Sequence, residues 1–306
     1  RLVADRKPCQ GEAVIKPELA HQCENQLGEG IIWSPAENAI LWTDILGKHY
    51  WRFDPATGKA SSHELSERLC CFAALGDGQL IAGFASGLAR FDLKNRQRDL
   101  IAHLESDQTT TRLNDGKLDR QGRLVFGTMD EGAGGPKPLG HVWSYDGASL
   151  PRILFDGIKI SNSIAFSPNG RLMYFADTPT RRIDVFDYDP ETGTPSNRRI
   201  FTELKADAGY PDGSTVDAEG CLWNAEWDGG RVVRYDPKGR IDRVISVPVP
   251  NVTCCAFGGP TLSDLYITTA RVGLSDSALE AAPLSGSLFV VKNAGQGLAD
   301  TPFRLS

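Results

Sequence analysis

The sequence predicts an all-β fold, a six-bladed β-propeller with four-stranded blades, and three observations support this prediction. First, a unit of two short apolar strands joined by a small or polar turn recurs six times along the 306-residue chain. Second, the spacings between successive leading leucines of these units are 39, 44, 48, 50 and 43 residues, the leucines being Leu41, Leu80, Leu124, Leu172, Leu222 and Leu265. Third, helical periodicity is nearly absent. Hairpin repeats of about 40–50 residues are typical of propeller blades.

The elements can be assigned in chain order. Residues 1–17 form an N-terminal extension without periodicity, and residues 18–306 form a single propeller domain. We expect a strand over residues 18–26 that completes the last blade and so removes an exposed sheet edge. Five of the six units end on an aromatic residue and Asp, and residues 54–58 and 189–193 have the composition of hairpin turns. Residues 275–282 form one or two helical turns.

Composition limits the classes of partner and the compartment. The chain has 33 basic and 39 acidic residues, a net charge of −6, which argues against nucleic-acid binding. No apolar run is long enough to span a bilayer, and the charged N-terminal stretch is not expected to act as a signal peptide. The seven cysteines include two adjacent pairs, a poor disulfide framework, so we expect buried thiols in a reducing cytoplasm. A closed propeller needs no partner, so we expect a monomer or a weak oligomer.

Several catalytic motifs are missing. The sequence has no Gly-x-Ser-x-Gly, no Walker loop and no Gly-x-Gly-x-x-Gly after a strand. The five histidines are scattered, without a His-x-x-x-His pair, which disfavours a histidine-rich zinc site. These absences argue against an α/β-hydrolase, a P-loop enzyme and a Rossmann dehydrogenase.

Polar residues at the starts of predicted inner strands are the remaining candidates for a site. Glu29, Asn114, Asn162 and Asp212 precede the inner strands of four different units at equivalent places. Taken alone, each is better explained by a turn. Together they would point into one channel, where carboxylate and amide oxygens form a hard ligand set. Such a set suits Ca²⁺, Mg²⁺ or Mn²⁺ and also accepts Fe²⁺.

Several long phrases carry a resemblance to a known family. They are the segments 27–33 (LGEGIIW), 112–119 (RLNDGKLD), 122–129 (GRLVFGTM), 160–162 (ISN), 210–213 (YPDG), 217–223 (DAEGCLW) and 257–259 (FGG). In this order they resemble the senescence-marker-protein/gluconolactonase/luciferin-regenerating-enzyme family of regucalcin-like sugar lactonases. The resemblance covers residues 21–291 and implies a six-bladed propeller with one divalent metal ion in the channel.

The resemblance also implies an activity. The family's metal ligands fall on Glu29, Asn162 and Asp212. The expected ion is Ca²⁺, with Zn²⁺, Mn²⁺, Mg²⁺ or Fe²⁺ as alternatives. The expected reaction is hydrolysis of an aldonolactone (arabino-, xylono-, galactono- or gluconolactone) to the aldonic acid. Asp212 is the candidate catalytic base for the attacking water.

Substrate contacts are implied at three further positions. Arg112 and Asn114 would bind the sugar lactone, and Glu131 would add an acidic contact from a Gly/Pro-rich loop. That loop, residues 132–140, is predicted to be a lid over one end of the channel. The sequence departs from the family at Asn162-Ser163, where Asn-Gly is usual, so the local backbone is expected to differ.

Three alternatives stay open at this point. The same metal cavity, with a more apolar wall, would serve a hydrolase of organophosphates or other esters. A calcium-binding regulatory propeller would bind the ion without turnover, and a protein-interaction propeller would bind none. The polar pair Arg112 and Asn114 favours a polyol substrate and hence the lactonase.

Overall fold

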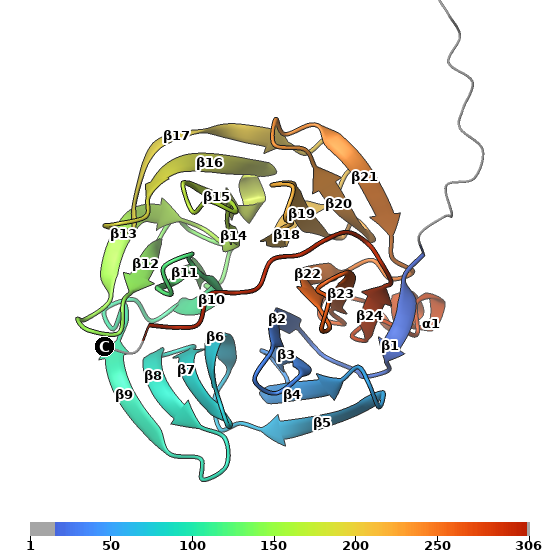
Figure 1. The fold of residues 1–306 in the computed structure, drawn as a ribbon, viewed down its shortest axis with the longest axis horizontal. Coiled ribbons are helices and arrows are strands. Elements are labelled where there is room, and N and C mark those ends of the chain that lie inside the picture. Colours follow the sequence, from blue (N-terminus) through green and yellow to red (C-terminus); the bar gives the residue numbers. More distant parts are fainter. Residues whose placement is uncertain (1–15, 305–306) are drawn as a thin grey trace, which may run out of the picture.

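Six antiparallel sheets of four strands each form a ring around a central channel (Figure 1), in this computed structural model, which describes residues 16–304. Consecutive strands of a blade run from the channel outward, and the inner strands β2, β6, β10, β14, β18 and β22 contact one another in that order around the ring. The propeller and the number of blades predicted from the repeat are confirmed.

The strands follow the chain blade by blade. The first blade is β2 (Gly28–Ser34), β3 (Ala39–Asp44), β4 (His49–Asp54) and β5 (Lys59–Glu64). The second is β6 (Leu69–Gly76), β7 (Gln79–Phe84), β8 (Gly87–Asp92) and β9 (Arg98–His103). The third is β10 (Thr111–Leu118), β11 (Leu124–Asp130), β12 (Gly140–Tyr145) and β13 (Arg152–Ile158).

The other three blades continue this order. The fourth is β14 (Ser161–Phe166), β15 (Leu172–Asp177), β16 (Arg182–Asp189) and β17 (Thr194–Glu203), with the 3-10 helix η1 (Thr178–Thr180) after β15. The fifth is β18 (Tyr210–Val216), β19 (Leu222–Trp227), β20 (Arg231–Tyr235) and β21 (Ile241–Ser246). The sixth is β22 (Val252–Gly258), β23 (Asp264–Thr269), β24 (Leu288–Val291) and β1 (Glu18–His21), with the helix α1 (Asp276–Ala281) before β24.

The ring is closed by its first strand, as predicted. β1 pairs with β24 and becomes the outer strand of the sixth blade. The strand ends at His21, five residues before the predicted end at Gln26. The chain turns inward there, because Cys23 and Asn25 donate their N–H groups to Ser287 and Gly286 instead of to a neighbouring strand.

The aromatic–Asp pairs of the repeat close hairpins. The Asp side chain accepts the N–H group two residues further on, at 2.8–3.0 Å, in all five units that carry it, namely Asp54, Asp92, Asp146, Asp189 and Asp236. Gly58 and Gly193 end two of these turns at φ of 69° and 67°, a conformation that favours glycine. The recurrence of the aromatic–Asp pair along this chain therefore reflects turn chemistry.

The hydrophobic core lies between the blades. In residues 16–304, six clusters of buried side chains are found, one at each boundary between neighbouring blades. At the boundary of the first and sixth blades, for example, Trp42 packs with Tyr266 and Leu288. Burial of apolar surface at these boundaries fixes the blades in a ring and leaves the inner strands free to present polar groups at the channel.

Every inner strand is irregular at an equivalent place. The pairing of the inner strand with its neighbour shifts register between Glu29 and Ile32 in β2, and the other five inner strands have the same kind of shift. A β-bulge bends a strand and redirects the side chains beside it. The bulges of β2, β10, β14 and β18 include or directly adjoin the four residues expected to point into the channel.

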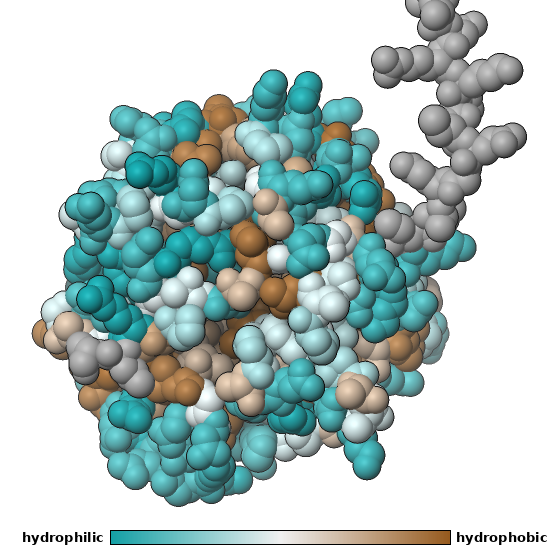
Figure 2. Space-filling view, in the orientation of Figure 1, coloured by the Kyte–Doolittle hydropathy of each residue, from teal (hydrophilic) through white to brown (hydrophobic). Residues whose placement is uncertain are grey.

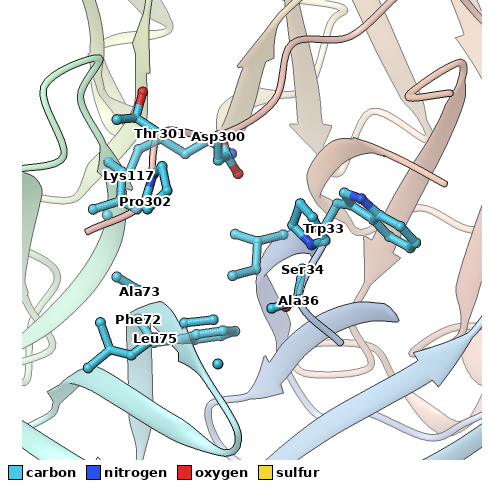
Figure 3. A pocket seen from close by; sticks show the side chains of 16 residues that line it. Trp33, Ser34, Ala36, Phe72, Ala73, Leu75, Lys117, Asp300, Thr301 and Pro302 are labelled. Atoms are coloured by element: carbon cyan, nitrogen blue, oxygen red, sulfur yellow. The ribbon is translucent and has the colours of Figure 1, made fainter. Parts of the chain in front are cut away.

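One mouth of the channel is crossed by the C-terminal segment 292–304, which we call the C-terminal strap (Figure 1). Two hydrogen bonds hold the strap. The N–H of Ala218 in the fifth blade donates to the carbonyl of Gln296, and the N–H of Arg304 donates to the carbonyl of Gly122 in the third blade. Apolar side chains gather in the central hollow of this face (Figure 2). Beneath the strap, the ends of β2, β6 and β10 and residues 300–302 surround a cavity of about 260 Å³ (Figure 3).

Phe303→Ala is expected to destabilise the fold. The Phe303 ring is only 6% exposed and stacks on Tyr145 at 5.7 Å between ring centroids. Truncating a buried Phe typically costs about 3 kcal/mol or more, so thermal unfolding should occur at a clearly lower temperature. Leu150→Ala, at a side chain that is 72% exposed, is the control and should leave the unfolding temperature nearly unchanged. Equal effects of the two changes would contradict a stabilising strap.

Two expectations from composition can be compared with the structure. Among residues 16–304, no helix is both long and apolar enough to cross a membrane. Cys23, Cys70, Cys71, Cys221, Cys254 and Cys255 are buried free thiols, and Cys9 lies outside the described residues. The predicted short helix is also present as α1, with Ser275 as its N-cap.

Candidate active site

The other end of the channel holds a cavity of about 280 Å³. Its lining residues are Leu27, Glu29, Leu46, Arg112, Asn114, Met129, Glu131, Ile160, Asn162, Thr178, Asp212, Trp227 and Val272. They come from the starts of β2, β10, β14 and β18, from the ends of β11 and β19, and from the loops at the same end. The cavity under the strap is lined by the opposite ends of the inner strands.

All six residues predicted to form the site line this one cavity. The first blade contributes Glu29, the fourth Asn162 and the fifth Asp212, each from its inner strand. The third blade contributes Arg112, Asn114 and Glu131. The structure therefore brings together residues that lie up to 183 positions apart in sequence, from Glu29 to Asp212.

The floor of the cavity contains a pair of buried carboxyl groups. Glu29 and Asp212 are 7% and 5% exposed, and their carboxyl groups are close enough for each to shift the pKa of the other. Burial raises the pKa of both groups, and the negative charge of the buried Asp115 raises it further. Two carboxyl groups this close retain a proton unless a cation takes its place.

Asn162 lies beside this pair and is held on two sides. Its Nδ2 donates to the hydroxyl of Thr178 at 2.8 Å, and its Oδ1 accepts from Nδ2 of Asn114 at 3.1 Å. The Thr178 hydroxyl in turn donates to the carbonyl of Pro211, next to Asp212. Thr178 thus connects the fourth and fifth blades and fixes the amide of Asn162 relative to the Asp212 backbone.

The backbone of Asp212 is fixed by two further buried side chains. Its carbonyl accepts from Oγ of Ser163 at 2.6 Å and from Nδ2 of Asn224 at 3.1 Å. Ser163 has a φ of 58°, close to the 60° of Gly30 in the bulge of β2. Ser163 therefore has a left-handed backbone, a conformation that favours glycine, and its hydroxyl makes a hydrogen bond that a glycine could not make.

The third blade presents a network of charged groups. Nε of Arg112 donates to Glu131 at 3.0 Å, and Nη1 of Arg112 donates to Oδ1 of Asn114 at 2.8 Å. Arg68 binds Glu131 from the other side through two hydrogen bonds of 2.9 and 2.7 Å. Partial burial alone would raise the pKa of Glu131, but the two guanidinium groups outweigh this effect and lower it. The network holds Arg112, which is 5% exposed, in a fixed position at the cavity wall.

The loop at residues 132–140, predicted to be a lid, does not line the cavity. Of this region only Glu131, which precedes the loop, lines the cavity. The loop is held by Asp130, whose carboxylate accepts the N–H groups of Gly132 and Lys137. Glycine and proline content predicted a loop correctly but carried no information on the direction in which Asp130 turns it.

The residues on the floor fit a divalent cation. Glu29, Asp115 and Asp212 are buried, and within residues 16–304 none of them forms an ion pair with Lys, Arg or His within 4 Å. Buried carboxylates require a partner of opposite charge or a proton. With the amide oxygen of Asn162, Glu29 and Asp212 could hold a hard cation, and the charge of the nearby Asp115 would favour it further.

A second acidic group of potential ligands, Asp217, Glu219 and Cys221, lies away from the cavity. Arg234 occupies the space between these carboxylates, with Nη2 at 2.7 Å from Asp217 and in contact with Glu219. Because an arginine already neutralises them, this group stabilises the fifth blade.

Sequence reasoning missed part of the site. No pattern in the sequence pointed to Thr178, to Arg68 or to the apolar residues that line the cavity, because their roles depend on contacts between blades. Asp115 could have been found. It follows Asn114 in a strand expected to line the channel, and a charged residue buried there needs a partner such as a cation.

Comparisons with known proteins agree with this geometry. Residues 27–271 match the model of the SMP-30/Gluconolactonase/LRE-like region. The L-arabinolactonase of Azospirillum brasilense is 42% identical, with 93% of this chain and 94% of that protein covered. The 6-deoxy-6-sulfogluconolactonase of Pseudomonas putida is 34% identical, with coverage of 90% and 94%.

A solved structure is similar over the same length. The calcium-binding protein regucalcin of Agrobacterium tumefaciens superimposes with a TM-score of 0.88 at 34% identity, covering 94% of this chain and 97% of that one. This chain belongs to the SMP-30/gluconolactonase/LRE-like family.

Proposed function

We propose that this protein is a metal-dependent lactonase, an ester-bond hydrolase that opens aldonolactones to aldonic acids. The observation that supports the proposal is that Glu29, Asn162 and Asp212 line one cavity together with Arg112 and Asn114. Relatives named as lactonases, one of them 42% identical, support the same reaction.

The residues have separate roles in this proposal. Glu29, Asn162 and Asp212 would hold the divalent ion, which supplies Lewis-acid polarisation of the lactone carbonyl when bound. Asp212 accepts the proton of the attacking water. Arg112 and Asn114 bind the hydroxyl groups of the sugar and orient the ester, so that the bond from the carbonyl carbon to the ring oxygen breaks. The water oxygen bonds to the carbonyl carbon, and the ring oxygen takes the proton back from Asp212 and leaves as a hydroxyl group of the open-chain acid.

The proposed ion is divalent, with Ca²⁺ as the first candidate. The three ligands offer only oxygen atoms, which calcium prefers, and the similar regucalcin structure is described as a calcium-binding protein. Oxygen ligands also accept Mn²⁺, Mg²⁺, Zn²⁺ and Fe²⁺, so the ion must be determined by measurement.

The test is an assay of acid release on a panel of aldonolactones, with spontaneous opening subtracted. Activity should vanish after chelation and return with one cation of a series that includes Ca²⁺, Mn²⁺, Mg²⁺, Zn²⁺ and Fe²⁺. Folded protein that hydrolyses none of the lactones with any of these ions would overturn the proposal. An aryl ester and a phosphotriester in the same panel test the ester-hydrolase alternative.

The chelated protein is expected to lose stability as the pH rises from about 5 to about 8. Burial raises the pKa of Glu29 and Asp212, whereas the same groups titrate near pH 4 in the unfolded chain. The folded state therefore holds a proton that the unfolded chain releases. This stabilisation is complete below about pH 4 and is lost as the pH rises through the raised pKa.

Calcium should reverse this loss because it replaces the proton. The increase in unfolding temperature caused by calcium should therefore grow from pH 5 to pH 8 in thermal melts. Glu29→Gln, which removes one carboxyl group of the pair, should make the chelated protein less sensitive to pH. A calcium effect of the same size at both pH values would contradict a buried acidic pair as the binding site.

A second candidate function is a calcium-binding regulatory protein without turnover, which the similarity to regucalcin favours. It requires the same cation site but gives no role to Arg112 and Asn114. Calcium binding measured by calorimetry, together with no hydrolysis of any lactone or ester, would favour this candidate.

A further inference from the structure

The cavity of the candidate site has two unlike walls. The third blade contributes Arg112, Asn114 and Glu131, the polar groups above the acidic floor. The apolar side chains of the other wall come from three different blades, with Trp227 from the fifth, Val272 from the sixth, and Leu27 and Leu46 from the first. All four of these side chains are partly exposed to the cavity. The other two apolar lining residues, Met129 and Ile160, lie on the side of the third blade.

The two walls face each other across the channel. The inner strands follow one another in the order β2, β6, β10, β14, β18 and β22 around the ring, so the third blade lies opposite the sixth (Figure 1). The fifth, sixth and first blades are consecutive. Their four apolar residues therefore form one arc centred opposite Arg112, which we call the apolar arc.

A 1,4-lactone ring also has two different sides. Its 2- and 3-hydroxyl groups lie on one side of the carbonyl, and the ring oxygen and the substituent on C4 lie on the other. With the carbonyl at the acidic floor and the hydroxyl groups bonded to Arg112 and Asn114, the C4 substituent points toward the apolar arc.

We infer that the site selects aldonolactones without a hydroxyl group on C6 over hexonolactones that carry one. The selected compounds are 6-deoxyhexonolactones, in which C6 is a methyl group, and pentonolactones, which have no C6. The inference rests on the proposed lactonase function. A terminal hydroxyl group placed against the apolar arc would lose its water without gaining a partner, whereas a methyl group gains apolar contact there.

The test compares lactones that share one ring configuration. D-Galactono-1,4-lactone and its 6-deoxy form differ only in the terminal hydroxyl group, and L-arabinono-1,4-lactone lacks the terminal carbon. We expect kcat/KM for the 6-deoxy compound to exceed that for galactonolactone by about 10- to 100-fold, the range in which an apolar pocket discriminates such pairs. The arabinonolactone should also exceed galactonolactone.

Matched variants locate the discrimination. Leu46→Gln places a polar group on the apolar arc and should lower the ratio toward one, whereas Met129→Gln makes the same change on the third blade and should leave the ratio unchanged. Val272→Thr, which conserves volume, tests the arc again should Leu46→Gln not fold.

Two results would overturn the inference while the proposed function stands. One is galactonolactone hydrolysed by the natural protein as well as its 6-deoxy form. The other is a ratio that Leu46→Gln and Met129→Gln change equally. Failure of all three lactones with every cation, in folded protein, would instead remove the proposed function and this selectivity with it.

Discussion

Asp212→Asn is expected to lower kcat/KM for lactone hydrolysis by about a thousandfold, a typical effect of removing a general base. The amide keeps the shape of the side chain and an oxygen for the cation but accepts no proton from water. The fold should persist, because the carbonyl of residue 212 still accepts from Ser163 and Asn224. The measurement is acid release at cation concentrations that saturate the variant, with circular dichroism to confirm folding.

Glu29→Gln is the matched control for this prediction. It makes the same chemical change in the other carboxyl group of the pair, and it should weaken cation binding measured by calorimetry. Since Glu29 has no proposed part in proton transfer, a saturating cation should restore much of the activity of this variant. Asp212→Asn with nearly normal turnover, or equal rescue of the two variants, would contradict the assignment of Asp212 as the base.

The fold was predictable because its signals are local and repeated. Each blade needs only hairpins, and hairpin chemistry is visible in sequence, as with Asp54 and Gly58 at one turn and Asp189 and Gly193 at another. Closure by β1 followed from the need to cover a sheet edge. Its early end at His21 was not predictable, because it depends on contacts with Ser287 and Gly286, more than 260 residues away.

The polar residues of the candidate site were predictable for a related reason. Glu29, Asn162 and Asp212 interrupt apolar strands at equivalent places, and a propeller directs such places to one channel. Their roles are a separate matter and stay a prediction. The supporting contacts were hidden, since Thr178 and Arg68 act across blade boundaries, and no periodicity in the sequence shows which side chain reaches across such a boundary.

The walls of the cavity were the least predictable part. A partly exposed Leu46 or Val272 is ordinary in any sequence, and single apolar residues on a surface carry no information. Only the order of the blades shows that four such residues from the fifth, sixth and first blades face the polar third blade. The sequence reasoning linked an apolar wall to other ester substrates and a polar pair to polyols, and the cavity contains both.

Arg112→Met is expected to lower kcat/KM by about 100-fold, the value of a buried hydrogen bond to a charged group. Methionine fills a similar volume but has no donor for the sugar hydroxyl groups. Arg112→Lys should recover little, because a single ammonium group cannot replace the planar guanidinium. Cation affinity measured by calorimetry should stay close to that of the natural protein, since Arg112 is not a proposed ligand.

Arg68→Met separates substrate binding by Arg112 from an indirect effect through Glu131. Arg68 holds the same carboxylate with two hydrogen bonds but does not line the cavity, so its loss should lower kcat/KM by about tenfold at most. If both variants lost activity equally, Arg112 would act by positioning Glu131, and the contact with the substrate would have to be assigned to Glu131 instead. A larger loss for Arg112→Met, with the change mainly in KM, is the result expected of a guanidinium that binds the sugar in both ground and transition states.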